Sequence, residues 1–170
     1  MMLRYFLLLF LSLPALAADQ QAEIERFLTE TLGKPPVAEM LWLVGDLQPA
    51  VRAILEHDYP AARVRYWRGG SRTVWILDEI GKEMPITVGV AINNGAVERV
   101  KVLVYRESRG WEVKSPAFTA QFSGAKLAEG QTLDRHIDGI SGATLSVRAL
   151  SRLTRLALLL DRHVNKGATP

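Results

Sequence analysis

Cysteine is absent from all 170 residues of the chain. Its absence excludes disulfides, thiolate-bound iron–sulfur clusters, cysteine-attached haem and redox-active thiols. Histidine is also scarce, with three residues, and the adjacent pair His57-Asp58 favours no metal site, because neighbours in sequence rarely point at one ion. The net charge of +3 is too small to indicate nucleic-acid binding, and no nucleic-acid-binding motif is present.

Long apolar runs are lacking as well. The run at residues 5–13 is shorter than the ~20 residues that a membrane-spanning helix needs. It follows Arg4 and precedes small residues, a pattern typical of a secretory signal cut after Ala17 or Ala18, with an uncleaved anchor as the alternative. We therefore expect an exported, periplasmic protein whose mature chain has no transmembrane helix.

The stretch with the clearest chemical character is residues 138–144, Asp-Gly-Ile-Ser-Gly-Ala-Thr, which leads into the longest helical pattern of the chain. Gly139 and Gly142 permit close approach of the backbone to a ligand. Ser141 is predicted to cap the helix, whose free N–H groups and dipole favour an anion such as a phosphate. A merely well-capped helix is the alternative interpretation.

The whole string resembles the flavinylation motif of FMN-binding domains, Asp-x-x-(Ser/Thr)-Gly-Ala-(Thr/Ser). Such domains occur in the C subunit of the sodium-translocating NADH:quinone reductase and the G subunit of the Rnf complex. In that family a flavin transferase joins the FMN phosphate to the hydroxyl of the final residue as a phosphoester. The resemblance implies that Thr144 is the acceptor and that Asp138, Ser141, Gly142 and Ala143 form the recognition string.

The resemblance extends over residues 86–160. Residues 86–105 alternate about Asn93-Asn94-Gly95, which predicts a hairpin with a type I′ turn, and the family's domains begin with such a hairpin.

The segment after this hairpin is expected to line the flavin pocket. Glu107, Ser108 and Gly110 match the family's Glu-Thr-x-Gly, with Ser in place of Thr. The resemblance implies that they contact the cofactor, although an ordinary turn explains them too. Trp111 is expected to supply an apolar face for the flavin ring.

The patterns in the N-terminal half of the chain indicate helices and strands that pack onto the core, without residues for chemistry. Residues 19–32 and 47–55 have helical spacing, residues 37–44 suit a strand or a buried helix, and residues 63–77 predict a hairpin. Trp67 and Trp75 suit cross-strand packing or contact with the flavin ring. A charged surface loop is expected over residues 78–85, and its Gly81-Lys82 pair lacks the flanking residues of a phosphate loop.

The helix after the motif has two faces. Its apolar face comprises Leu145, Ala149, Leu153, Leu156 and Leu160. Its basic face comprises Arg148, Arg152, Arg155, Arg162 and Lys166. The basic face suits either solvent or an acidic partner or anionic lipid.

Together these features predict an α+β fold, with a mainly antiparallel sheet flanked by helices. We expect a signal peptide over residues 1–17, helices and a hairpin that pack onto the core over residues 18–84, and an FMN-binding domain over residues 85–166. The resemblance implies covalent FMN, a flavin transferase for maturation and a membrane-bound redox partner. We expect neither a metal nor catalytic side chains.

The function that follows is electron transfer between a membrane reductase and an acceptor, as a subunit or domain rather than a stand-alone enzyme. The alternative is a non-redox binding or assembly module of an envelope complex. A reductase with its own substrate pocket ranks lower, because no residues define a substrate.

Overall fold

A computed structural model of the protein describes residues 12–33 and 37–166. Its elements follow in the order α1 (Ser12–Leu32), β1 (Ala38–Trp42), α2 (Leu47–Leu55), β2 (Arg63–Gly69), β3 (Arg72–Ile80), β4 (Pro85–Asn93), β5 (Ala96–Val104), η1 (Trp111–Lys114), α3 (Pro116–Thr119), η2 (Ala120–Phe122), η3 (Glu129–Gln131) and α4 (Thr144–Lys166). The three predicted helices and both predicted hairpins are confirmed, and α1 begins earlier than the helical spacing indicates.

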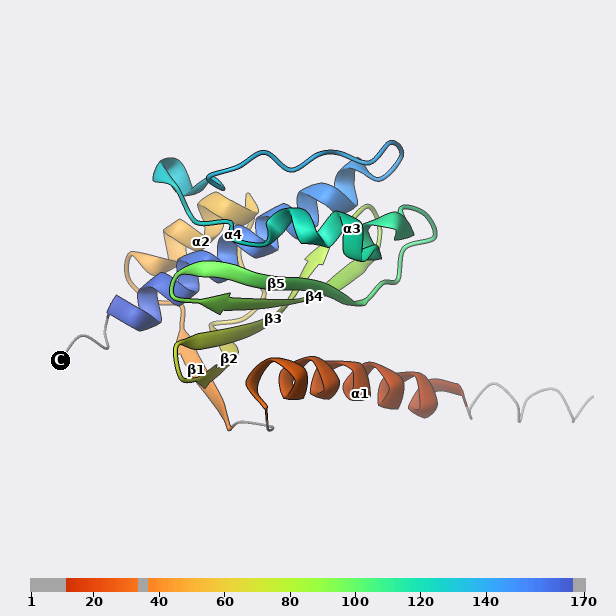
Figure 1. Ribbon diagram of the computed structural model, residues 1–170, viewed down its shortest axis with the longest axis horizontal. Helices are drawn as coiled ribbons and strands as arrows, with labels where there is room; N and C mark the ends of the chain where they lie inside the picture. The colour runs from red at the N-terminus through yellow and green to blue at the C-terminus, as the bar shows by residue number, and fades with distance from the viewer. Residues whose placement is uncertain (1–11, 34–36, 167–170) are drawn as a thin grey trace, which may run out of the picture.

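The strands form one antiparallel sheet in the order β1-β2-β3-β4-β5, so each strand pairs with its neighbour in sequence (Figure 1). Together with the helices, this sheet confirms the predicted α+β fold. The turn between β4 and β5 has positive φ angles at Asn94 (51°) and Gly95 (74°), as a type I′ turn requires. Asn-Gly adopts these angles at low cost, which explains why the sequence alone locates this hairpin.

Helices cover both faces of the sheet (Figure 1). The larger core lies between the sheet and the helices α2 and α4, whereas α1 packs on the opposite face. Successive side chains of a strand point to opposite faces. In β4, Val88 and Val90 therefore join the core under α4, and Ala91 joins the cluster around Phe27 of α1. A strand buried on both faces holds the central part of the sheet rigid.

The structure corrects two expectations for the N-terminal half. β3 continues to Ile80, so Asp78 and Glu79 belong to a strand, and the connection to β4 comprises residues 81–84 alone. The charges of this segment predict a surface loop, yet Glu79 is only 5% exposed. Trp75 is fully buried and stacks on Tyr66, with ring centroids 4.8 Å apart. Trp75 therefore packs within the core and cannot face a flavin ring.

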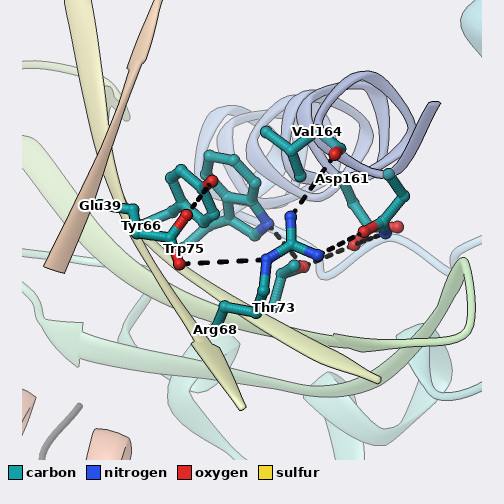
Figure 2. Close-up of polar contacts among 8 residues, drawn as sticks. Glu39, Tyr66, Arg68, Thr73, Trp75, Asp161 and Val164 are labelled. Carbon is teal, nitrogen blue, oxygen red and sulfur yellow. Dashed lines mark hydrogen bonds and ion pairs between the residues drawn. The ribbon is translucent and has the colours of Figure 1, made fainter. Parts of the chain in front are cut away.

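A buried polar network joins the far end of α4 to the sheet (Figure 2). Trp75 Nε1 donates to Thr73 Oγ1 at 3.0 Å, and Thr73 Oγ1 donates to Asp161 Oδ1 at 2.6 Å. Asn165 Nδ2 donates to the same carboxylate oxygen at 3.0 Å, while Arg68 Nη1 donates to Asn165 Oδ1 at 2.9 Å. Burial raises the pKa of the Asp161 carboxyl. The network ties the C-terminal part of α4 to the sheet.

A second polar contact, His57 with Glu79, makes stability depend on pH. His57 Nδ1 lies 2.9 Å from the Asp58 carbonyl and Nε2 lies 3.0 Å from Glu79 Oε2. Both partners only accept hydrogen bonds, so only the imidazolium satisfies both, and the Asp58 carbonyl and Glu79 raise the His57 pKa. The stabilisation is complete below the unfolded-state pKa of about 6.5 and is lost as pH rises through the folded-state pKa.

We therefore expect His57→Gln to destabilise the protein at about pH 5.5 and to have little effect at about pH 8.5. Urea unfolding of the wild type and the variant at both pH values measures the difference. His163→Gln, at an exposed position of α4, is the matched control. An equal loss for His57→Gln at both pH values would contradict the assignment.

Two further predictions concern the signal peptide and the boundary between the two parts of the mature chain. Residues 1–11 of the predicted signal peptide lie outside the described residues, and residues 12–17 belong to α1. The predicted boundary between residues 84 and 85 falls between β3 and β4, which are adjacent strands of one sheet. Among the described helices, none is long and apolar enough to cross a membrane.

Candidate functional site

The predicted recognition string ends where α4 begins. The first helical residue is Thr144, which is exposed, and the carbonyl of Ala143 accepts the N–H of Val147 at 3.0 Å. Ala143 therefore occupies the N-cap position. The prediction that Ser141 caps the helix was wrong, because Ser141 lies in the turn before the helix.

That turn depends on Gly142, whose φ is 80°. The N–H of Ala143 donates to the carbonyl of Ile140 at 3.0 Å and closes the turn. Ala143 itself is buried, whereas the residues on either side of it are exposed. The turn thus anchors the string through one small side chain and leaves the hydroxyl-bearing residues at the surface.

A cleft of about 580 Å³ opens at the start of α4. Its walls come from three segments that are distant in sequence: residues 82–83, 107–109 and 142–146. The predicted site residues on these walls are Glu107, Ser108, Gly142, Ala143 and Thr144. The hairpin β4–β5 and the packing of α4 on the sheet bring the three segments together.

The remaining predicted site residues lie around this cleft. Gly110, Trp111 and Ser141 line an adjoining hollow of about 280 Å³, which shares Ser108, Arg109 and Gly142 with the larger cleft. Trp111 is 65% exposed at the start of η1. Asp138 lines neither hollow, and its side chain is directed to solvent. The contacts of these residues with a cofactor stay predictions.

Glu107 fastens the loop of residues 81–84 to the site. Its Oε1 accepts the backbone N–H groups of Lys82, of Glu83 at 2.8 Å and of Met84 at 3.0 Å. Burial raises the pKa of the Glu107 carboxyl, but the three hydrogen bonds outweigh it and the net pKa is lowered. Glu107 therefore acts on the site through the loop that it holds.

We expect Glu107→Ala to release this loop. The three N–H groups lose their acceptor, so amide exchange of residues 82–84 should rise about tenfold, while the β4–β5 amides stay protected. Hydrogen exchange read by mass spectrometry measures the change. Glu107→Gln is the control because its amide oxygen can accept the same bonds. Unchanged exchange in Glu107→Ala would refute the role of this carboxylate.

A second contact fastens the other wall of the cleft. The hydroxyl of Tyr105 donates to the carbonyl of Arg109 at 2.5 Å and lies 3.0 Å from Ser146 Oγ, which is buried. Gly110, with φ 81°, packs against the same residues. The segment after β5 and the first turn of α4 are therefore joined directly. Sequence reasoning missed Tyr105, and the hydroxyl at position 146 was the only signal for this contact.

Leu145 also differs from expectation. It was predicted on the apolar face of α4 together with Ala149 and Leu153, but it is 41% exposed and lines the cleft. The buried face of the helix begins with Ser146 and Ala149. Leu145 therefore faces the site rather than the core.

Two cations line the cleft, together with the carboxylates of Glu83 and Glu107. Lys82 and Arg109 both line it, and sequence reasoning assigned neither to the site. Lys82 Nζ lies 3.4 Å from Glu83, in an exposed pair of little strength. Arg109 has no ion-pair partner within residues 12–33 and 37–166. The N–H groups at the start of the 23-residue helix α4 add to the positive potential at Thr144.

These features define a domain that can hold a phosphorylated, drug-sized cofactor, because the volume of the cleft lies within the usual range for such ligands. Its chemistry fits FMN: cations and a helix start suit the phosphate, and Leu145 offers apolar surface to a ring.

The comparison with protein families agrees. Residues 81–159 match the model of the FMN-binding domain. Residues 81–159 are therefore similar to an FMN-binding domain, and this similarity supports FMN binding by this part of the chain. The match begins at the loop that Glu107 holds and includes every residue that lines the larger cleft. A comparison with curated proteins gives no significant match.

Proposed function

We propose that the protein carries FMN joined through its phosphate to Thr144 Oγ, and that it is exported and transfers electrons between a membrane-bound reductase and an acceptor. The position of Thr144 is the observation that supports this best. Its hydroxyl is exposed at the first residue of α4, on the wall of a cleft that also presents Lys82 and Arg109.

The neighbouring hydroxyls are poorer acceptors. Ser146 is 4% exposed, and its Oγ is engaged by Tyr105. Ser141 is exposed, but it lies in the turn before the helix and lines the smaller hollow, which contains Arg109 but not Lys82. Ser108 is exposed on the same cleft, but it lies away from the start of α4 in sequence; Thr144 combines exposure, room for a ligand and the N–H groups of the helix start, so the geometry favours it as the acceptor.

The attachment step needs an activated phosphate. A flavin adenine dinucleotide meets this need, because its pyrophosphate bond can break with AMP as the leaving group. Thr144 Oγ then forms the new bond to phosphorus, and the hydroxyl proton passes to a base of the flavin transferase or to solvent. We therefore expect the transferase to use the dinucleotide as its donor.

The cofactor, when bound, supplies one- and two-electron redox chemistry, which this cysteine-free chain does not offer through its own side chains. The chain's residues would hold and orient it. Lys82, Arg109 and the start of α4 balance the phosphate charge, while the loop held by Glu107 closes one wall. A covalent bond keeps the cofactor with an exported protein, where lost FMN is not replaced.

A non-redox binding or assembly module is the second candidate function. The observation that supports it is the edge strand β1, on which Met40 and Trp42 are about half exposed. The basic face of α4 supports it less than the sequence suggested. Arg155 donates to the carbonyl of Gln131, and Arg162 donates to that of Leu127, so these arginines serve internal contacts.

The two functions differ in a simple measurement. The full chain, coexpressed with a flavin transferase, should run as a fluorescent band on a denaturing gel, and the peptide that contains Thr144 should gain the mass of FMN. A colourless protein with an unmodified peptide would exclude the flavin carrier and favour the assembly module.

A further inference from the structure

The string 138–144 has a fixed backbone although its polar side chains are exposed. The N–H of Asp138 donates to Gln121 Oε1 at 2.8 Å. Ile137 and Ile140 are partly buried and pack on the main core. The Asp138 side chain is 84% exposed, with only the exposed His136 nearby at 3.7 Å. The backbone of the string is thus held by the core and by Gln121, and its polar side chains are accessible to solvent.

Gln121 lies in a well-packed segment of the chain. It lies in η2, between Phe118 and Phe122, whose rings meet edge to face with centroids 5.9 Å apart. Phe122 is fully buried and Phe118 nearly so. Because the backbone on both sides of Gln121 is fixed by the core, its side-chain oxygen is a well-placed acceptor for Asp138.

Further contacts join the same two segments of the chain. Arg135 Nη1 donates to the carbonyl of Ser123 at 2.6 Å, and Asp134 Oδ1 accepts the N–H of Lys126 at 3.0 Å. Residues 134–138 therefore run alongside residues 121–126, with Gln121 as the contact closest to the motif. This arrangement defines the approach of the chain to Thr144.

We propose that Gln121 is a positioning residue for flavin attachment, because it holds residues 138–144 in place on the folded domain for the flavin transferase. The inference rests on the proposed attachment at Thr144. A recognition surface that is already ordered loses less conformational freedom on binding than a flexible chain. A small displacement of Asp138 would also move the string out of register with the reacting phosphate.

The test compares Gln121→Ala with the wild type as substrates for purified transferase and flavin adenine dinucleotide. We expect the initial rate of FMN incorporation at subsaturating protein to fall about three- to tenfold, the factor expected from losing one such hydrogen bond. Gln121→Glu keeps an acceptor oxygen and should restore most of the rate. Gln48→Ala, at an exposed position of α2, is the matched control.

The outcomes separate the inference from the proposed function. If the wild type gains FMN and Gln121→Ala gains it at the same rate, Gln121 has no positioning role and the flavin carrier stands. If the wild type gains none, the proposed function itself fails. Thermal unfolding distinguishes a structural effect: a rate loss that Gln121→Glu does not rescue, together with a lowered unfolding midpoint, would overturn the positioning role.

Discussion

Replacing Thr144 by alanine is expected to abolish covalent attachment of FMN. The variant loses the only exposed hydroxyl at the start of α4 that also faces Lys82 and Arg109 in the larger cleft. Alanine is a good helix former, so α4 and the fold should remain intact. Mass spectrometry of the intact chain after coexpression with the transferase should show the unmodified mass, with an unchanged circular dichroism spectrum.

Two matched variants test the choice of acceptor. Thr144→Ser keeps a hydroxyl and should still gain FMN, whereas Ser146→Ala should gain it at Thr144, because Ser146 Oγ is buried against Tyr105. FMN found on Ser146 or Ser141 in the Thr144→Ala protein would contradict the assignment of a single acceptor.

Gly110→Ala should cause the largest loss of stability among the variants considered. A Cβ at this position would lie 2.9 Å from the hydroxyl of Tyr105 and 3.1 Å from Ala143 Cβ, in a backbone conformation with φ 81°. Strain at a positive φ and overpacking each cost about 1–3 kcal/mol, so we expect a total of about 2–6 kcal/mol. Urea unfolding measures this free energy.

The control for Gly110→Ala is Gly95→Ala. Gly95 also has a positive φ, 74°, but a Cβ there meets nothing within 4 Å. It should therefore show the backbone cost alone, about 1–2 kcal/mol. Because Gly110 packs against the first turn of α4, its variant should also slow FMN incorporation, while Gly95→Ala should not. Equal effects of both variants on stability would show that the close packing at Gly110 contributes nothing.

The elements of this fold were predictable where the signal is local. The helices over residues 19–32 and 47–55 follow from apolar spacing, and the β4–β5 hairpin follows from Asn94-Gly95, whose angles the turn requires. The end of β3 was not predictable in this way. Glu79 reads as a loop residue in sequence, but His57 lies against it and makes its burial tolerable.

In the candidate site, too, only the local features were predictable from the sequence. Residues 138–144 by themselves identified a helix start suited to a phosphate, and their resemblance to the flavinylation motif pointed to FMN; the family match agrees with FMN binding. This was possible because glycine, a hydroxyl and the following helical pattern act over a few residues. Covalent attachment at Thr144 stays a proposal.

Only the tertiary structure decided what surrounds that string. It brings Lys82 and Arg109 to Thr144, uses Glu107 to hold a loop and buries Ser146 while leaving Thr144 exposed. These contacts join residues up to 60 or so positions apart, and such pairs leave no periodic trace in a single sequence. The sequence by itself therefore determined which string is the candidate for the chemistry, and the packing of α4 on the sheet decided which side chains lie around it.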